Sequence, residues 1–362
     1  MLSSPAWFDA HLDLAYLAEC GRDMHADPAD ARGRHQPAAV TLASLVEGRV
    51  RAVLATIFTQ AVTEGDDETG AHTYALGDAE AAHTAGHRQL KLYHAWRDAG
   101  IIELMPRRGA VGQASSLPSL LTGILMECAD PIRSPDDLDW WAEQGVVAIG
   151  MAWWHQSRYA GGNGVETGLT DLGRELIPRM DALGIVHDAS HLSDASLSEL
   201  FERTDAPVVA THSNSRAIMS GGAGTLPASG GGGILPASDL ALQRHIPDEF
   251  IAEIARRGGI IGLNLYRRFI KPDLGATERP TIDDAIAHVE HVCEIAGHRH
   301  AVGLGSDMDG GLTANDLPDG IDRPADLVRL ADALSARGWS DDDVRDFAWG
   351  NWARFWGIVT SD

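Results

Sequence analysis

The sequence has little cysteine, and the three cysteines that it contains are far apart. Cys20, Cys128 and Cys293 are odd in number and form no Cys-x-x-Cys pair. This pattern argues against a disulfide framework and against a zinc site built from thiolates. The cysteine content therefore fits a protein of a reducing compartment.

Long apolar runs are also missing. No run reaches the roughly 18 apolar residues that a membrane-spanning helix needs. The first residues, MLSSPAWFDAHLD, lack the basic region and apolar stretch of a signal peptide. The final residues, GIVTSD, lack the hydrophobic tail of a lipid-anchor signal. We therefore expect a soluble cytoplasmic protein with no membrane partner.

Positive charge is scarce as well. The chain has 29 lysine and arginine residues against 52 aspartate and glutamate residues, which gives a formal net charge of −23. A protein of this charge repels a phosphate backbone over most of its surface. Nucleic acid is therefore not an expected partner.

What the sequence does contain is a regular alternation of strand and helix patterns. Eight short apolar runs lie at residues 6–11, 51–59, 122–128, 146–152, 184–191, 206–213, 259–265 and 301–307. Many of the helical patterns between them open with Ser, Thr or Asp and close with Gly, as helix caps do. Eight such runs fit a parallel barrel better than a doubly wound sheet of about five or six strands. The sequence predicts an α/β fold, a single (β/α)8 TIM-type barrel domain over residues 1–362.

Two of the predicted connections from strand to helix are unusually long. Residues 59–73 are acidic and follow the second strand, and residues 220–239 are rich in Gly, Pro and Ser and follow the sixth. Such connections form the catalytic face of a barrel. For residues 220–239, a mobile cover over the site and a disordered insertion both stay open.

Side chains that bind metals or transfer protons stand where the predicted strands end. They are His11 and Asp13 after the first strand, Glu127 after the third, His191 after the fifth, His212 after the sixth and Asp307 after the eighth. The carboxyl ends of barrel strands carry the active site. We therefore predict a metal site at this end of the barrel.

Imidazole and carboxylate ligands without thiolate suit zinc, with manganese or cobalt as alternatives. Five ligands are too many for one tetrahedral ion, so we predict two Zn²⁺ ions with Glu127 as the bridge. One ion takes His11, Asp13 and Glu127, and the other takes Glu127, His191 and His212. A carbamylated lysine is not expected as the bridge, because neither Lys91 nor Lys271 ends a predicted strand.

Seven motifs in order along the chain resemble those of one family. The motifs are DAHLD, MECADPI, GIVHDASHLSD, VVATHSNSRAI, RHIPDEF, VGLGSDMDG and WGNWARFWGI, between about residue 8 and residue 357. Together they are similar to the membrane dipeptidase (renal dipeptidase) family of zinc hydrolases. The resemblance implies an amidohydrolase-type barrel with two zinc ions on the ligands named above. It also implies that Arg244 binds the C-terminal carboxylate of the substrate and that Asp307 is the catalytic acid–base group.

The sequence departs from the family pattern on the fourth strand. The renal enzymes present there a His that contacts the scissile amide oxygen, and the matching position here is Trp153. His155 follows two residues later, which is the same-face spacing of an extended chain. His155 is therefore a candidate substrate-binding residue, and a position on the rim of the site is the open alternative.

These observations predict a metallo-dipeptidase. A water that bridges two zinc ions, and is hydroxide-like because of them, attacks the peptide carbonyl, and Asp307 carries the proton to the leaving amine. The expected partner is a small dipeptide, including those with a C-terminal D-residue. Two alternatives stay open: another amidohydrolase-type enzyme for N-acyl amino acids or cyclic amides, and a non-catalytic binding protein on the same barrel. A homodimer is one assembly state that the sequence allows.

Overall fold

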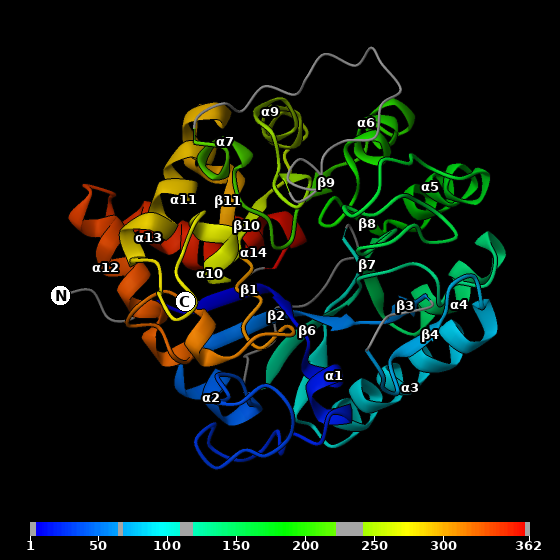
Figure 1. Cartoon of the computed structure of the whole chain (residues 1–362), viewed down its shortest axis with the longest axis horizontal. Coiled ribbons are helices and arrows are strands. Elements are labelled where there is room, and N and C mark those ends of the chain that lie inside the picture. The colour runs from blue at the N-terminus through cyan, green and yellow to red at the C-terminus, as the bar shows by residue number, and fades with distance from the viewer. Residues whose placement is uncertain (1–4, 64–67, 109–118, 222–241, 359–362) are drawn as a thin grey trace.

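The computed structural model describes residues 5–63, 68–108, 119–221 and 242–358. Parallel strands at its centre form a nearly closed barrel, and helices surround it (Figure 1). Around the barrel the strands are β10 (Ile261–Leu263), β11 (Val302–Leu304), β1 (Trp7–Leu12), β2 (Val50–Ile57), β6 (Leu120–Met126), β7 (Val146–Gly150), β8 (Val186–Asp188) and β9 (Val208–Val209). A parallel bridge between Ala210 and Ile261 links the two ends of this series. The predicted barrel is confirmed, and each predicted run overlaps one of these strands.

Three short strands were not predicted. β5 (Ile102–Leu104) pairs with the first half of β6, and β7 pairs with the second half. β3 (Gln60–Val62) and β4 (Thr73–Ala75) pair with each other inside the acidic connection 59–73. None of the three lies within an apolar run as long as those around β8, β10 and β11, so the sequence pattern did not indicate them. Most of the second long connection, residues 222–239, lies outside the described residues.

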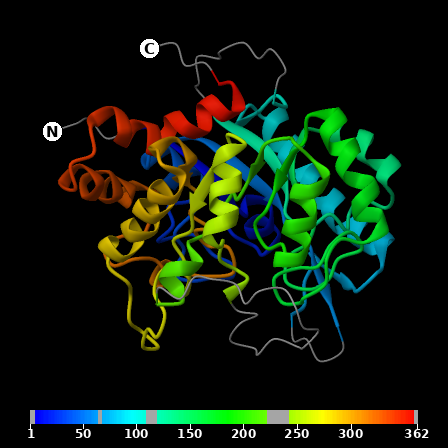
Figure 2. The same ribbon diagram turned by 90° about the horizontal axis from the view of Figure 1, so that it is seen from above.

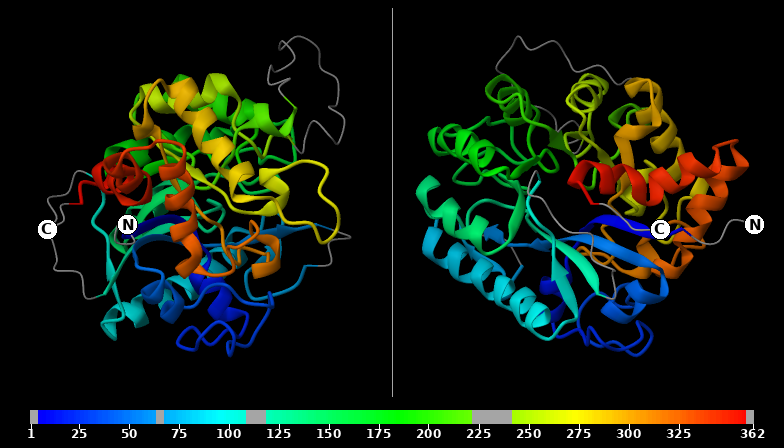
Figure 3. Two further views of the ribbon diagram at one scale, coloured as in Figure 1. Left: turned by 90° about the vertical axis from the view of Figure 1, so that its left-hand side faces the viewer. Right: turned by 180° about the vertical axis from the view of Figure 1, so that it is seen from behind.

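The helices lie around the barrel in all views (Figures 2 and 3). They are α1 (Leu14–Glu19), α2 (Leu42–Glu47), α3 (Ala79–Asp98), α4 (Leu138–Glu143), α5 (Asp171–Leu183), α6 (Asp194–Arg203), α7 (Arg216–Met219), α9 (Asp248–Arg256), α10 (Arg267–Ile270), α11 (Ile282–Ala296), α12 (Val328–Ala336), α13 (Asp341–Arg345) and α14 (Asn351–Trp356). In the part of the chain that is described, no helix combines the length and the apolar character needed to span a bilayer.

The predicted cap residues stop and start these helices. The side chain of Thr170 accepts a hydrogen bond from Gly173 N at the start of α5, and Thr281 caps α11 in the same way. Gly184 and Gly297 end these two helices in the left-handed conformation, with φ of 67° and 75°. Glycine adopts this conformation without steric cost. The helix boundaries therefore follow from local sequence.

The hydrophobic core has two parts. The larger cluster fills the space between the strands and the helices and contains buried side chains such as Tyr93 and Trp141. The smaller one gathers side chains from β1, β2, β6, β7, β8 and β9, together with Trp352 of α14. Because residues from so many strands meet in this cluster, it fills the inside of the barrel. The polar residues at the carboxyl ends of the strands therefore rest on a closely packed barrel interior.

A buried ion pair joins two distant loops beside the barrel. Arg22, after α1, donates to the carboxylate of Asp309, after β11, and both side chains are fully buried. Asp309 also accepts hydrogen bonds from Ala39 N (2.9 Å) and Val40 N (2.7 Å). Arg22 Nη2 donates to His35 O (2.7 Å). The pair therefore fixes the segment between α1 and α2 against the loop that carries Asp307.

We expect Asp309→Ala to lower the free energy of unfolding by about 3–5 kcal/mol, because it leaves a guanidinium buried without its partner. Urea unfolding followed by circular dichroism measures this change. Asp342→Ala removes a partner from the exposed Asp342–Arg345 pair and should change stability little. Equal effects of the two substitutions would contradict a structural role for the buried pair.

Candidate active site

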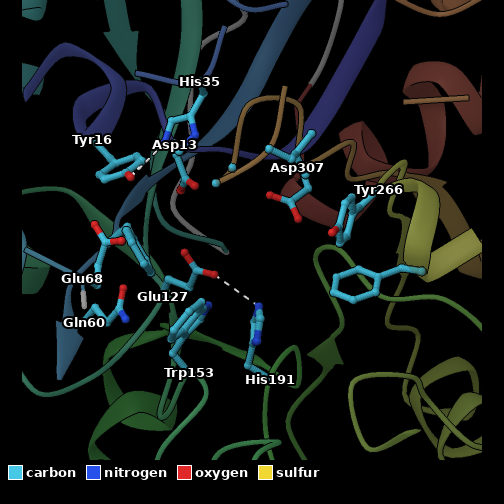
Figure 4. A pocket seen from close by; sticks show the side chains of 15 residues that line it. Asp13, Tyr16, His35, Gln60, Glu68, Glu127, Trp153, His191, Tyr266 and Asp307 are labelled. Carbon is cyan, nitrogen blue, oxygen red and sulfur yellow. Dashed lines mark hydrogen bonds and ion pairs between the residues drawn. The ribbon is translucent and has the colours of Figure 1, made fainter. Parts of the chain in front are cut away.

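The structure brings the six predicted metal-binding and acid–base residues together. His11 belongs to β1, and Asp13, Glu127, His191, His212 and Asp307 stand on the segments that follow β1, β6, β8, β9 and β11. Figure 4 shows the carboxylates of Asp13, Glu127 and Asp307 and the ring of His191 around a common space. The pairing register of β1 with β2 shifts between Asp9 and Leu12. The shift lies at the end of β1, where His11 and Asp13 project into the same space, as their spacing of two predicts.

The two oxygens of Glu127 face two different sets of ligand atoms. Glu127 Oε2 lies 3.7 Å from His11 Nε2. Glu127 Oε1 lies 3.3 Å from His191 Nε2 and 3.6 Å from His212 Nε2. His11 Nε2 also lies 3.7 Å from Asp13 Oδ1. A carboxylate with one oxygen toward each set has the position that a bridging ligand needs.

The unpaired polar atoms of the site fit metal ions. Both ring nitrogens of His11 and Glu127 Oε2 are buried and have no hydrogen-bond partner among the described residues. The Nε2 atoms of His191 and His212 lie 2.9 Å apart. Buried polar atoms without partners are unfavourable, and a cation between them supplies the missing interaction. The described residues include two groups able to hold an ion: His11, Glu127 and His212, and His11, Asp13 and Asp307.

Hydrogen bonds behind two of the histidines set which nitrogen is free. His191 Nδ1 donates to Asn163 Oδ1 at 2.9 Å. The Thr211 hydroxyl donates to Asp188 Oδ2 (2.6 Å) and therefore accepts from His212 Nδ1 (2.9 Å). Both rings thus direct an Nε2 lone pair into the site, as metal-binding histidines do. Thr211 lies in the motif VVATHSNSRAI, but no sequence pattern marks Thr211 or Asn163 as the hydrogen-bond partner of a metal-binding histidine.

Burial controls the protonation of these side chains. It lowers the pKa of His11, His191 and His212 well below the usual range, which keeps the rings neutral and able to bind a metal. Burial raises the pKa of Asp13 to about 6, against the hydrogen bond from Thr56. Burial, followed by the negative charges of Asp13 and Asp307, raises the pKa of Glu127. Carboxylates this close together need positive charge beside them.

Asp307 sits on a tight turn beside this cluster. Its backbone is left-handed, with φ of 57°. Asn264 Nδ2 donates to Asp307 Oδ2 at 2.9 Å, while Asp307 Oδ1 lies 3.9 Å from His11 Nε2. A Cβ atom at Gly310 would lie only 1.9 Å from Asp307 Oδ1 and 3.0 Å from Asp13 Oδ2. Only glycine lets the loop approach both carboxylates this closely.

Arg244 is buried next to the site. Its Nη2 donates to His212 O at 2.8 Å, and its Nη1 donates to Ser213 Oγ at 3.1 Å. Its guanidinium lies 4.8 Å from the centre of the Phe269 ring. No carboxylate in the described residues forms an ion pair with Arg244, and its Nε has no hydrogen-bond partner there. A buried guanidinium without a carboxylate partner is suited to binding an anionic group.

A pocket of about 330 Å³ is lined by Asp13, Glu127, His191 and Asp307, while His11, His212 and Arg244 are not among its lining residues. Its lining comprises Asp13, Tyr16, His35, Phe58, Gln60, Glu68, Glu127, Trp153, His191, Tyr266, Phe269, Asp307, Gly310, Gly311 and Leu312. His155 does not line this pocket and faces a much smaller neighbouring one. The spacing argument for His155 requires an extended chain, but β7 ends at Gly150 and the chain then bends. A substrate contact by His155 stays a prediction.

Comparison with known proteins places the chain in a family. It matches the model described as membrane dipeptidase (peptidase family M19) over residues 1–224 and 237–361. The chain belongs to the membrane dipeptidase family. The family predicted from the motifs is confirmed, and the protein is a metal-dependent dipeptidase that hydrolyses peptide bonds. The expectation of a non-catalytic binding protein on the same barrel is therefore not supported.

Individual members of the family are distant relatives. The chain is 29% identical over 226 residues to an uncharacterized protein of Klebsiella pneumoniae, covering 60% of this chain and 74% of that protein. It is 31% identical over 169 residues to an uncharacterized dipeptidase of Schizosaccharomyces pombe, covering 47% of this chain and 33% of that one. The match to the yeast protein thus spans about a third of its length.

Two solved structures of dipeptidases share the fold. One is described as dipeptidase AC, a metallo peptidase, with 22% identity, a TM-score of 0.77 and coverage of 98% of this chain and 100% of that one. The other is a metallo peptidase from Rhodobacter sphaeroides liganded with a phosphinate mimic of L-Ala-D-Ala, with 21% identity, a TM-score of 0.76 and coverage of 98% and 99%. This chain thus shares its overall fold with those two proteins.

Proposed function

We propose that this protein hydrolyses small dipeptides with two zinc ions, and that Glu127 bridges them. The observation that carries the proposal is the position of Glu127, with Oε2 toward His11 and Oε1 toward His191 and His212. Oxygen and nitrogen ligands without thiolate fit zinc. When bound, two zinc ions supply a Lewis acid for the amide oxygen and lower the pKa of a water molecule toward neutrality.

The chain's own residues supply binding and proton transfer. Arg244 binds the C-terminal carboxylate of the dipeptide and thereby orients its peptide bond over the metal ligands. Asp307 accepts a proton at Oδ1, the oxygen that faces the metal ligands, while Asn264 holds Oδ2 in place. Asp307 then delivers the proton to the nitrogen of the leaving amine, because an amide anion is a very poor leaving group.

The substrate class includes dipeptides with a C-terminal D-residue. Support comes from the related Rhodobacter sphaeroides enzyme, whose structure holds a mimic of L-Ala-D-Ala. N-acyl amino acids carry the same free carboxylate and are the second candidate class, since Arg244 serves both. Cyclic amides without a carboxylate gain nothing from Arg244.

A hydrolysis screen tests this function. Purified protein is stripped of metal with a chelator, reloaded with zinc, and assayed on matched L,L- and L,D-dipeptides and on N-acyl amino acids. We expect turnover of dipeptides by the zinc-loaded protein and reversible loss of turnover after chelation. Turnover of N-acyl amino acids alone would assign the second class.

We expect Arg244→Ala to reduce kcat/KM for dipeptides with a free C-terminus by about 30- to 1000-fold, as loss of a buried charge-assisted pair costs on the order of 2–4 kcal/mol. Dipeptides with an amidated C-terminus should change little from their low starting values. Arg257→Ala is the matched control, because Arg257 also stacks on a phenylalanine, Phe201, but pairs with Glu253 away from the site. Equal losses on free and amidated substrates would reject the carboxylate contact.

A further inference from the structure

The pocket has two different ends, one on each side of the metal ligands. Phe269, on which Arg244 stacks, lies beside Tyr266, with ring centres 4.8 Å apart. Figure 4 shows Tyr266 on one side of Glu127 and Asp307, and Tyr16, Gln60 and Glu68 on the other. A dipeptide held by its carboxylate at the Arg244 end therefore extends its N-terminal residue toward the Tyr16 end.

The Tyr16 end is walled by aromatic rings. Phe58 lies at the centre, and its ring centre is 5.3 Å from those of both Tyr16 and Trp153. Tyr16 and Phe58 are only 4% and 8% exposed, and Trp153 is half-buried. The Tyr16 hydroxyl is hydrogen-bonded to His35 Nε2 at 3.0 Å. The three residues, which we call the aromatic wall, thus present ring surface to the pocket.

Trp153 is held in a fixed position. Asn163 N donates to Trp153 O at 3.2 Å, and a Cβ atom at Gly162 would lie 2.1 Å from that oxygen. The Trp153 ring centre is 5.8 Å from that of His191, whose Nδ1 donates to Asn163 Oδ1. Asn163 therefore supports both the wall and a metal ligand. The distance between the wall and the metal ligands is thereby set by the fold.

Glu68, the acidic side chain at the Tyr16 end, forms an ion pair with Arg34. Glu68 Oε1 lies 2.8 Å from Arg34 Nη1. The Arg34 guanidinium partly offsets the negative charge of Glu68 and so reduces its attraction for a basic side chain. The aromatic wall is therefore the surface at this end that can distinguish one N-terminal side chain from another.

We propose that the aromatic wall is the subsite for the side chain of the N-terminal residue, and that Trp153 makes the enzyme select dipeptides with a large apolar residue there. The inference rests on the proposed function, which sets the direction of the dipeptide. Apolar side chains gain free energy when they leave water for an aromatic surface. Glycine at the same position gains nothing from the wall.

Two series of dipeptides test the proposal with the full-length, zinc-loaded enzyme. In the series X-Ala, X is Gly, Ala, Leu or Phe, and in the series Ala-X the same residues vary at the other end. We expect kcat/KM of the wild type to be about 10- to 100-fold higher for Leu-Ala or Phe-Ala than for Gly-Ala. Trp153→Ala should reduce this ratio to about 3-fold or less, because Leu-Ala and Phe-Ala lose more of their kcat/KM than Gly-Ala does.

The neighbouring Trp154 gives a matched control. It is 42% exposed and does not line the main pocket, so Trp154→Ala should keep the wild-type preference. Trp153→Leu is a second variant that keeps an apolar side chain, in case Trp153→Ala does not fold, and it should lower the preference partway. Circular dichroism and metal content show whether each variant is folded and loaded.

The outcomes of these assays distinguish failure of the inference from failure of the proposed function. Equal loss of Gly-Ala and Phe-Ala hydrolysis in Trp153→Ala would overturn the inference, as would a changed preference in the Ala-X series only. Wild-type hydrolysis that does not depend on X would overturn the inference and leave the proposed function intact. Absence of hydrolysis for every dipeptide in both series would overturn the proposed function, and the inference with it.

Discussion

Glu127→Ala is expected to remove metal from both sites and to abolish activity. Purified wild-type protein should contain close to two divalent ions per chain, and the variant should lose occupancy at both positions because each loses the same ligand. Loss of Lewis-acid chemistry worth several kcal/mol corresponds to a fall in kcat/KM of at least about 10³-fold. Elemental analysis and kinetics on one preparation measure both quantities.

The comparison with other ligand variants makes this result specific. His212→Ala should weaken one site, since its Nε2 faces only Glu127 Oε1 among the carboxylate oxygens. Glu103→Ala removes a glutamate from β5, which pairs with the strand that precedes Glu127, and should keep both ions and full activity. Loss of a single ion in Glu127→Ala would contradict the bridge.

Asp307→Asn is expected to lower kcat by about 10²- to 10⁴-fold, the contribution typical of a general acid–base group. Asparagine has nearly the same shape and still accepts the hydrogen bond from Asn264, but it cannot carry a proton. KM should therefore change little, and metal content should stay near two ions per chain. Steady-state kinetics and elemental analysis of the same sample are the measurements.

Loss of metal in Asp307→Asn would assign a different role to Asp307. Asp307, with His11 and Asp13, forms a group able to hold a metal ion, so loss of an ion in proportion to activity would make Asp307 a ligand and not the proton carrier. Asp319→Asn, an exposed change on the same connection, should leave kcat unaltered. Asp309 offers no substitute for Asp307, because Arg22 and two backbone amides occupy its carboxylate.

Sequence patterns predicted the barrel because local and periodic features encode it. The apolar runs became the strands of the barrel. The Thr170 side chain caps the start of α5, and Gly184, which has no side chain, ends it in the left-handed conformation. The strands β3, β4 and β5 were not predicted because, unlike β8, β10 and β11, they do not lie within a longer apolar run. The spacing of two assumed an extended chain at His155, whereas the chain bends after Gly150, so a substrate contact by His155 stays a prediction.

The sequence by itself determined the fold class, the family and the residues that meet at the carboxyl ends of the strands. Parallel strands of a barrel all end on one face, so a residue's place after a strand is enough to locate it there. Only the tertiary structure decided the partners of these residues: Asn163 behind His191, Arg22 on Asp309, and Phe58 against Trp153. Those contacts join segments far apart in the chain, and their distances follow from how the loops pack together, which no local pattern records.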